Sequence, residues 1–96
     1  MSPLKKKKLN KIRIQLDNLD NSLLKIIKKR TNLVKQVLVL KDKKNQIVDQ
    51  KRIKFILKNI KNKSIKNNID PKITNRIWKN MIWSYIDFEK RNFKKK

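Results

Sequence analysis

Apolar residues recur every three or four positions from residue 9 to residue 41, and this spacing is the strongest constraint on the fold. It predicts one long α-helix with an apolar seam of the coiled-coil kind. The seam contains Leu9, Ile12, Leu16, Leu19, Leu23, Ile26, Leu33, Val37 and Leu40. At about 1.5 Å per residue the helix is about 50 Å long, which is longer than a compact domain of this size is wide. We therefore expect it to pack against a partner subunit.

Two shorter helices follow. Asp49 has the character of an N-cap, and apolar residues at helical spacing after it predict a helix to about residue 63. Residues 64–69 are polar and turn-like, and Asp70 followed by Pro71 predicts the start of a third helix. That helix is expected to bury Ile73, Ile77, Trp78, Met81, Ile82, Tyr85 and Phe88, with Glu89 one turn beyond Tyr85.

The fold class is therefore all-α, with one long, one short and one medium helix in each chain. We expect a single helical domain at 9–93, a basic N-terminal tail at 1–8 and a basic C-terminal tail at 94–96. A chain of 96 residues buries a limited share of its surface, which also favours a dimer.

The composition excludes several classes of chemistry. The sequence has no Cys, no His and no Gly. A disulfide framework, a thiolate nucleophile, a His general base and a glycine-rich phosphate loop are all excluded. We expect neither a metal ion nor a cofactor, and any proton chemistry is left to carboxylates, Lys, Tyr and hydroxyls.

The net charge of +22 suggests a nucleic-acid or membrane partner, but a simpler cause exists. Lys, Asn and Ile number 24, 12 and 14, whereas Ala and Gly are absent, as AT-rich codon usage would produce. We therefore do not expect nucleic acid to be a partner. The basic residues 1–8 precede no apolar stretch of signal-peptide length, and no apolar run is long enough to span a bilayer. We therefore expect a cytoplasmic protein.

One position of the long apolar seam is occupied by a charge. The same period places Arg30 between Ile26 and Leu33, where an unpaired charge would cost several kcal/mol. The adjacent row holds further ionisable residues at Arg13, Asp20 and Lys41. A solvated edge with extended side chains is the simple explanation for one such residue. Four on one seam favour a binding cluster.

Residues 12–30, IRIQLDNLDNSLLKIIKKR, resemble the first helix of the all-helical chorismate mutases. The family pattern, R-x-x-[IL]-D-x-[IL]-D-x-x-[IL]-[IL]-x-x-[IL]-x-x-R, begins at Arg13 and ends at Arg30. The family then has a Lys where Lys41 stands, and a D-x-x-R-E start to its second helix, of which Asp49 and Arg52 match all but the last letter. The resemblance covers about residues 12–91.

The resemblance implies an intertwined homodimer that rearranges chorismate to prephenate in the shikimate pathway of aromatic amino-acid biosynthesis. This pericyclic step needs neither a nucleophile nor a metal, only positioning and stabilised charge. By the resemblance, Arg13 and Arg30 bind the two carboxylates, and Lys41 contacts a carboxylate and the ether oxygen. Arg52 supports that cluster, and Asp49 lies near the ring hydroxyl.

Helix geometry adds a point that is independent of the family. Arg13 and Arg30 are about 25 Å apart along a straight helix, whereas Arg30 and Lys41 are about 16 Å apart and can converge. If Arg13 serves any site, it serves that of the neighbouring subunit.

Three positions depart from the family pattern. Ile53 stands where many members have a Glu that binds the ring hydroxyl, Tyr85 lies near a position of a small hydroxyl residue, and Glu89 replaces the usual Gln at the ether oxygen. Glu89 can assist that oxygen only as a hydrogen-bond donor, so activity is expected to fall as pH rises through its titration. Ile53 and the aromatic run near Tyr85 resemble the isochorismate-pyruvate lyases of the same fold.

Three functions are therefore open to the chain from its sequence. The first is a chorismate mutase with chorismate as substrate, in which Arg30, Lys41 and Glu89 are catalytic and Arg13, Asp49, Arg52 and Tyr85 complete the substrate-binding set. The second is a lyase or dual-activity relative, and the third is a non-catalytic basic helical binding protein.

Overall fold

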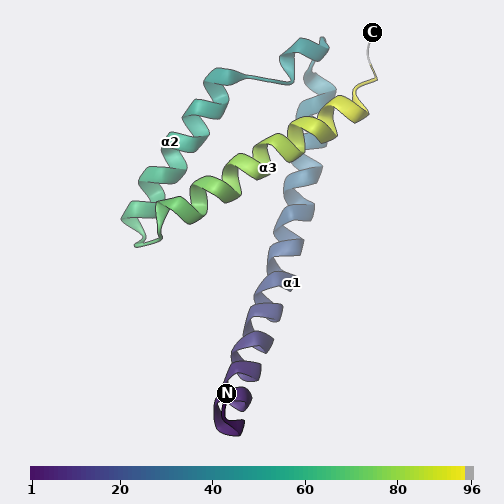
Figure 1. The fold of residues 1–96 in the computed structure, drawn as a ribbon. Helices are drawn as coiled ribbons and strands as arrows, with labels where there is room; N and C mark the ends of the chain where they lie inside the picture. The colour runs from purple at the N-terminus through teal and green to yellow at the C-terminus, as the bar shows by residue number, and fades with distance from the viewer. Residues whose placement is uncertain (95–96) are drawn as a thin grey trace. The chain divides into compact units, whose positions relative to one another are not determined.

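The computed structural model describes residues 1–94, and these form three α-helices and one short 3-10 helix (Figure 1). Helix α1 spans Pro3–Leu40, η1 Lys44–Gln46, α2 Gln50–Lys66 and α3 Pro71–Asn92. No β-strand occurs within this range, so the predicted all-α class with one long, one short and one medium helix is confirmed. Of the expected C-terminal tail, Lys94 is non-helical and residues 95–96 lie outside the described part.

Helix α1 begins at Pro3, six residues before the start of the apolar seam. Proline suits the first position of a helix because it has no N–H to leave unpaired. The preceding Ser2 accepts a hydrogen bond from the Lys5 N–H on its side-chain oxygen at 3.3 Å. The residues expected to be an N-terminal tail are therefore helical from Pro3 onward.

Residues 1–33 form one compact unit, which contains α1 up to Leu33 and no other helix. Most of the large apolar side chains of this unit are exposed in the single chain: Leu4, Ile12, Ile14, Leu16, Leu19, Leu23, Leu24, Ile26, Ile27 and Leu33. A monomer rarely leaves so many neighbouring apolar side chains in water without a binding role for them.

The second compact unit starts at Val34 and contains the end of α1, η1, α2 and α3. Helices α2 and α3 pack against each other (Figure 1). The core of this unit is small and consists of Leu38, Ile47, Ile82 and Ile86. Around it pack the partly buried residues Val48, Ile53, Ile56, Leu57 and Phe93.

Aspartate side chains fix the first turns of both shorter helices. Asp49 accepts a hydrogen bond from the Arg52 N–H at 3.0 Å, and Asp70 accepts one from the Lys72 N–H at 2.9 Å. Each satisfies one of the backbone donors that the first turn of a helix leaves unpaired. The predicted N-caps at Asp49 and Asp70 are confirmed.

Helix α2 continues to Lys66, three residues beyond the predicted end, and includes Ser64. Serine was expected in the turn, because its hydroxyl competes for backbone groups. Here the Ser64 hydroxyl donates to the Ile60 carbonyl at 2.6 Å, within the helix. The turn comes two residues after the helix end, at Asn68, whose φ of 57° lies in the left-handed region that Asn tolerates.

The apolar face of α3 is only partly buried. Ile82 is buried, and Trp78, Met81, Tyr85 and Phe88 are half-buried. Ile73 and Ile77, which were expected in the core, are 56% and 52% exposed, so that expectation is wrong for the single chain. The two side chains lie one turn apart on α3, on the side of the helix away from the buried residues.

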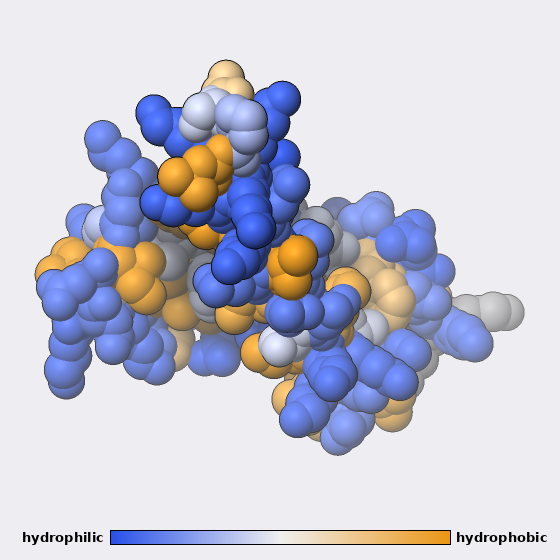
Figure 2. Space-filling view, turned by 90° about the horizontal axis from the view of Figure 1, so that it is seen from below, coloured by the Kyte–Doolittle hydropathy of each residue, from blue (hydrophilic) through white to orange (hydrophobic). Residues whose placement is uncertain are grey.

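The face of the molecule shown in Figure 2 is mainly hydrophilic, with apolar patches between the charged side chains. Within residues 1–94, the helices contain no stretch that is long and apolar enough to cross a membrane.

Candidate active site

An ion pair joins two of the predicted site residues from distant parts of the chain. The Lys41 Nζ donates to the Glu89 Oε1 at 2.9 Å, across 48 residues of sequence. The lysine side chain is 20% exposed and the glutamate side chain 8% exposed. Charge-assisted hydrogen bonds of this length are among the stronger polar contacts in proteins. The pair therefore fixes a cation in a largely buried position.

Local structure on both sides orients this pair. Lys41 follows the last residue of α1, and its N–H donates to the Leu38 carbonyl at 3.1 Å, which closes the helix end. Glu89 lies in the last turns of α3, one turn after Tyr85 and beside the buried Ile86. The apolar core thus borders the carboxylate, while the lysine approaches it from the end of α1.

The segment after Lys41 is held by a side chain that the sequence did not single out. The Gln46 Oε1 accepts hydrogen bonds from the N–H groups of Asp42 and Lys43, at 2.7 and 2.9 Å. This contact replaces the backbone partners that a helix would provide. The segment has no apolar periodicity. The sequence signal for this contact is the amide residue Gln46, three positions after Lys43.

Tyr85 is half-buried on the same helix as Glu89. Its ring meets that of Phe88 edge to face, with centroids 6.5 Å apart and planes at 87°. This is a favoured arrangement of two aromatic rings, and it limits the rotation of the tyrosine.

The two predicted residues at the start of α2 have clear local roles. The Asp49 carboxylate caps the helix through the Arg52 N–H, as described above. The Arg52 guanidinium lies over the Phe55 ring, 5.2 Å from its centroid, in a cation–π contact. The spacing of three residues on one helix is the signal for this contact, which the sequence analysis missed.

Ile53, which departs from the family pattern, packs against the core of the second unit. Its side chain offers no hydrogen bond at that point of α2. The position therefore contributes apolar packing and not a polar contact.

The remaining two predicted residues belong to the first unit. Arg30 is half-buried and Arg13 is exposed on α1. The five others, Lys41, Asp49, Arg52, Tyr85 and Glu89, all belong to the second unit. Among them, the Lys41–Glu89 ion pair joins distant segments of the chain.

Comparison with known proteins gives one family. The model of the family described as chorismate mutase type II matches residues 12–90. All seven predicted site residues lie inside this range, from Arg13 to Glu89. Neither the curated proteins nor the solved structures give a match.

Proposed function

The chain belongs to the type II chorismate mutases and rearranges chorismate to prephenate, and from this premise we propose which of its residues carry the reaction. The observation that carries the proposal is the Lys41–Glu89 ion pair. It holds a cation, from the end of α1, beside a buried carboxylate of α3, at positions that match the family's pattern for the ether oxygen.

The rearrangement breaks the ether C–O bond as a new C–C bond forms, and negative charge grows on the ether oxygen. No proton transfer or covalent intermediate is needed. The protein must fold the enolpyruvyl side chain over the ring and place hydrogen-bond donors at the oxygen. Donors that are fixed before the reaction stabilise the transition state without reorganisation.

Lys41 is proposed as the donor to the ether oxygen. An ammonium group has three N–H donors, and the contact with Glu89 uses one of them. The remaining donors are available for the ether oxygen and a substrate carboxylate. Glu89 positions Lys41 by accepting one of its hydrogen bonds.

Arginines are proposed to bind the two carboxylates of chorismate. A guanidinium matches a carboxylate with two parallel hydrogen bonds, which a lysine cannot provide. Arg30 binds one carboxylate in its own subunit's site, and Arg13 binds the other. Arg52 supports this cluster from α2.

Two further residues are proposed to complete the substrate-binding set. Asp49, at the start of α2, contacts the ring hydroxyl, since a carboxylate accepts hydrogen bonds from a hydroxyl group. Tyr85 lines the site one turn before Glu89.

The functional unit is proposed to be a homodimer in which each Arg13 serves the partner's site. The exposed apolar residues of the first unit support this, because a second copy of α1 would remove them from water. Arg13 lies within this segment, so the same contact would bring it to the partner. The catalytic domain at 9–93 and a cytoplasmic location remain predictions from the sequence.

Mixed dimers test the shared site. Arg13→Ala and Arg30→Ala are each expected to be inactive. After subunit exchange, half of the dimers are mixed and each has one intact site, so about a quarter of the wild-type specific activity should return. The control replaces the second partner with the double variant Arg13→Ala/Arg30→Ala, which cannot restore a site. No return of activity despite proven exchange would contradict the shared arginine.

A substrate assay separates the mutase from the related lyase. The protein is incubated with chorismate and, separately, with isochorismate, and prephenate, salicylate and pyruvate are measured. We expect prephenate from chorismate. Salicylate and pyruvate from isochorismate at a higher rate would favour the lyase instead.

A further inference from the structure

A groove between α2 and the start of α3 lies apart from the proposed active site. Its volume is about 420 Å³, and it is lined by Leu57, Lys58, Lys61, Pro71, Lys72 and Asn75. Sites for small molecules are commonly 300–1,000 Å³ in volume. None of the seven predicted active-site residues lines the groove.

The polar lining of the groove is positive. It contains three lysines, Lys58 and Lys61 from α2 and Lys72 from α3, together with the amide of Asn75 and no carboxylate. The acidic residue next to it in sequence, Asp70, caps α3 by accepting from the Lys72 N–H at 2.9 Å. The charges that a ligand would meet first are therefore the lysine ammonium groups, which suit an anion with more than one negative charge.

The other two lining residues, Leu57 and Pro71, are apolar and half-buried. Leu57 packs against the core of the second unit, and this packing fixes its position. Lysine ammonium groups next to the apolar side chains of Leu57 and Pro71 suit a ligand that has a charged group and an apolar body, because each part of the ligand can contact side chains of matching polarity.

A buried polar contact holds the two walls of the groove together. The side-chain oxygens of Ser64 and Thr74 are 2.7 Å apart, and the hydroxyl of Ser64 donates to the Ile60 carbonyl. Either hydroxyl can be the donor in this pair, since Thr74 also has a backbone acceptor, the Pro71 carbonyl at 3.4 Å. Ser64 lies one turn after Lys61 and Thr74 precedes Asn75, so the contact fixes both helices next to the groove.

A second hollow continues the basic lining along α3. It is formed by Lys72, Ile73, Asn75 and Arg76, and so shares two residues with the groove. Arg76 adds a fourth cation to the lining of the two hollows.

We propose that the groove binds a small dianion with an apolar ring or chain, whose negative charge is carried by a phosphate or by two carboxylates. The ligand's charged end contacts the ammonium groups of Lys58, Lys61 and Lys72, and its apolar part lies on Leu57 and Pro71. This would give the enzyme a second anion site in addition to the one for its substrate.

Nuclear magnetic resonance of the full chain locates the binding directly. Phenyl phosphate and phthalate serve as the two kinds of aromatic dianion, and inorganic phosphate as the anion without an apolar part. We expect the backbone amide signals of Lys58, Lys61 and Asn75 to shift on titration, and phenyl phosphate to bind several times more tightly than inorganic phosphate. The relative response to phenyl phosphate and phthalate shows which charged group the groove prefers.

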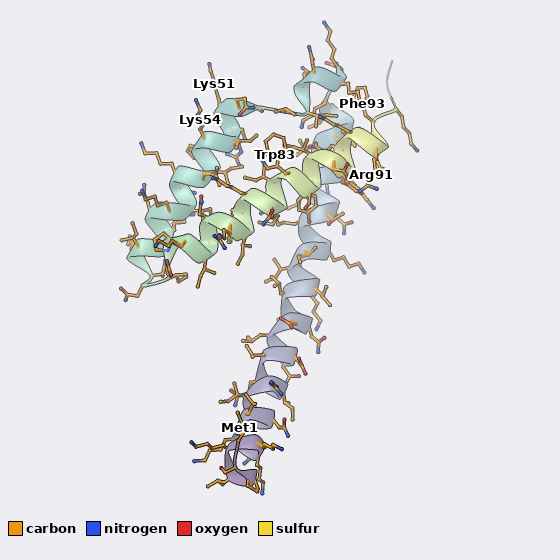
Figure 3. The ribbon with its side chains drawn as sticks, viewed as in Figure 1. Met1, Lys51, Lys54, Trp83, Arg91 and Phe93 are labelled. Carbon is orange, nitrogen blue, oxygen red and sulfur yellow. The ribbon has the colours of Figure 1, made fainter. Side chains whose placement is uncertain are left out.

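Matched variants separate the groove from the overall charge. The variant Lys58→Gln/Lys61→Gln/Lys72→Gln removes the three cations of the groove. Its control, Lys7→Gln/Lys51→Gln/Lys90→Gln, removes the same charge from exposed lysines outside the groove. Figure 3 marks Lys51 and its neighbour Lys54 on α2. Lys51 is about 10 Å along that helix from Lys58.

The groove variant is expected to weaken phenyl phosphate binding about tenfold, which corresponds to about 1.4 kcal/mol. The control should change it by less than about twofold in 0.1 M salt, where charges beyond about 10 Å are largely screened. Equal losses in the two variants would overturn the proposal, as would signal shifts confined to Lys41 and Glu89. Inorganic phosphate that binds as tightly as phenyl phosphate would also overturn it. Circular dichroism confirms that both variants fold.

Discussion

Removing one member of the Lys41–Glu89 ion pair should destabilise the second unit more than any exposed ion pair can. The variant Lys41→Met keeps a side chain of similar length and leaves the Glu89 carboxylate, 8% exposed, without its cation. Breaking a buried pair in this way costs about 3–5 kcal/mol, because an uncompensated charge remains inside. Water reaches the 20% exposed lysine, so we expect the lower part of that range, about 3 kcal/mol.

The double variant Lys41→Met/Glu89→Leu should recover much of that loss. Two unit charges 2.9 Å apart attract by about 6 kcal/mol at an effective dielectric constant of 20, and desolvation of both groups offsets most of it. Once both charges are absent, neither the attraction nor the desolvation remains. The coupling energy of the double-mutant cycle is therefore expected to be about 2 kcal/mol.

The exposed pair of Arg91 and Asp87 is a matched control. Its N–O distance is 2.8 Å, almost that of the buried pair, but its side chains are 64% and 68% exposed. Pairs of this kind on a helix couple by about 0.3–0.5 kcal/mol. The free energy of unfolding is measured in urea at one protein concentration, because an oligomer unfolds differently at different concentrations. Equal coupling in the two cycles would refute the reasoning that burial sets the strength of the Lys41–Glu89 pair.

Three further predictions concern the proposed site and the α2–α3 contact. Arg30→Ala should lower kcat/KM by about a hundredfold or more, whereas Arg91→Ala, outside the family pattern, should leave it nearly unchanged; comparable losses would mean that overall charge is responsible. Ser64→Ala and Thr74→Val each break the buried hydroxyl contact and should each lower the free energy of unfolding by about 1 kcal/mol, because the hydroxyl that remains keeps only its backbone partner, the Pro71 or the Ile60 carbonyl; no loss in either variant would contradict a stabilising contact. Glu89→Gln keeps a side-chain oxygen that can accept from Lys41 and should retain most of the kcat/KM, whereas Glu89→Leu removes that acceptor and should lower kcat/KM about tenfold or more; an equal loss in both variants would oppose the role of Glu89 in orienting Lys41.

The helices of this chain could be predicted because their signals are local. The caps at Asp49 and Asp70 lie within three residues of the N–H groups that they accept from, and both were identified correctly. The end of α2 was placed too early, since Ser64 reads as a turn residue in isolation. Its burial depends on Thr74, ten residues away, and no local pattern contains that contact.

The candidate site was predictable only through the resemblance to a family. Lys41 and Glu89 are 48 positions apart, and no pattern in the sequence predicts that they are in contact. The burial of Ile73 and Ile77 was inferred from the apolar period of the third helix, but a period shows only that a face is apolar. It does not show which molecule covers that face. Both side chains are exposed in the single chain, as are most apolar residues of the first unit.

The ion pair changes what Glu89 can contribute to the reaction. From sequence alone, the carboxyl group is predicted to help the ether oxygen only as a protonated donor. In the structure, its Oε1 accepts from Lys41, which lies next to the end of α1 with its backbone held by the Leu38 carbonyl. A carboxylate in this role fixes the direction of the ammonium group, whose two other N–H donors stay available. The free energy needed to fix the Lys41 side chain is then spent during folding. No reorganisation of the donor is needed during the reaction, as electrostatic catalysis requires. A residue that acts in this way need not touch the substrate, so the family's Gln and this chain's Glu can serve the same oxygen by different routes.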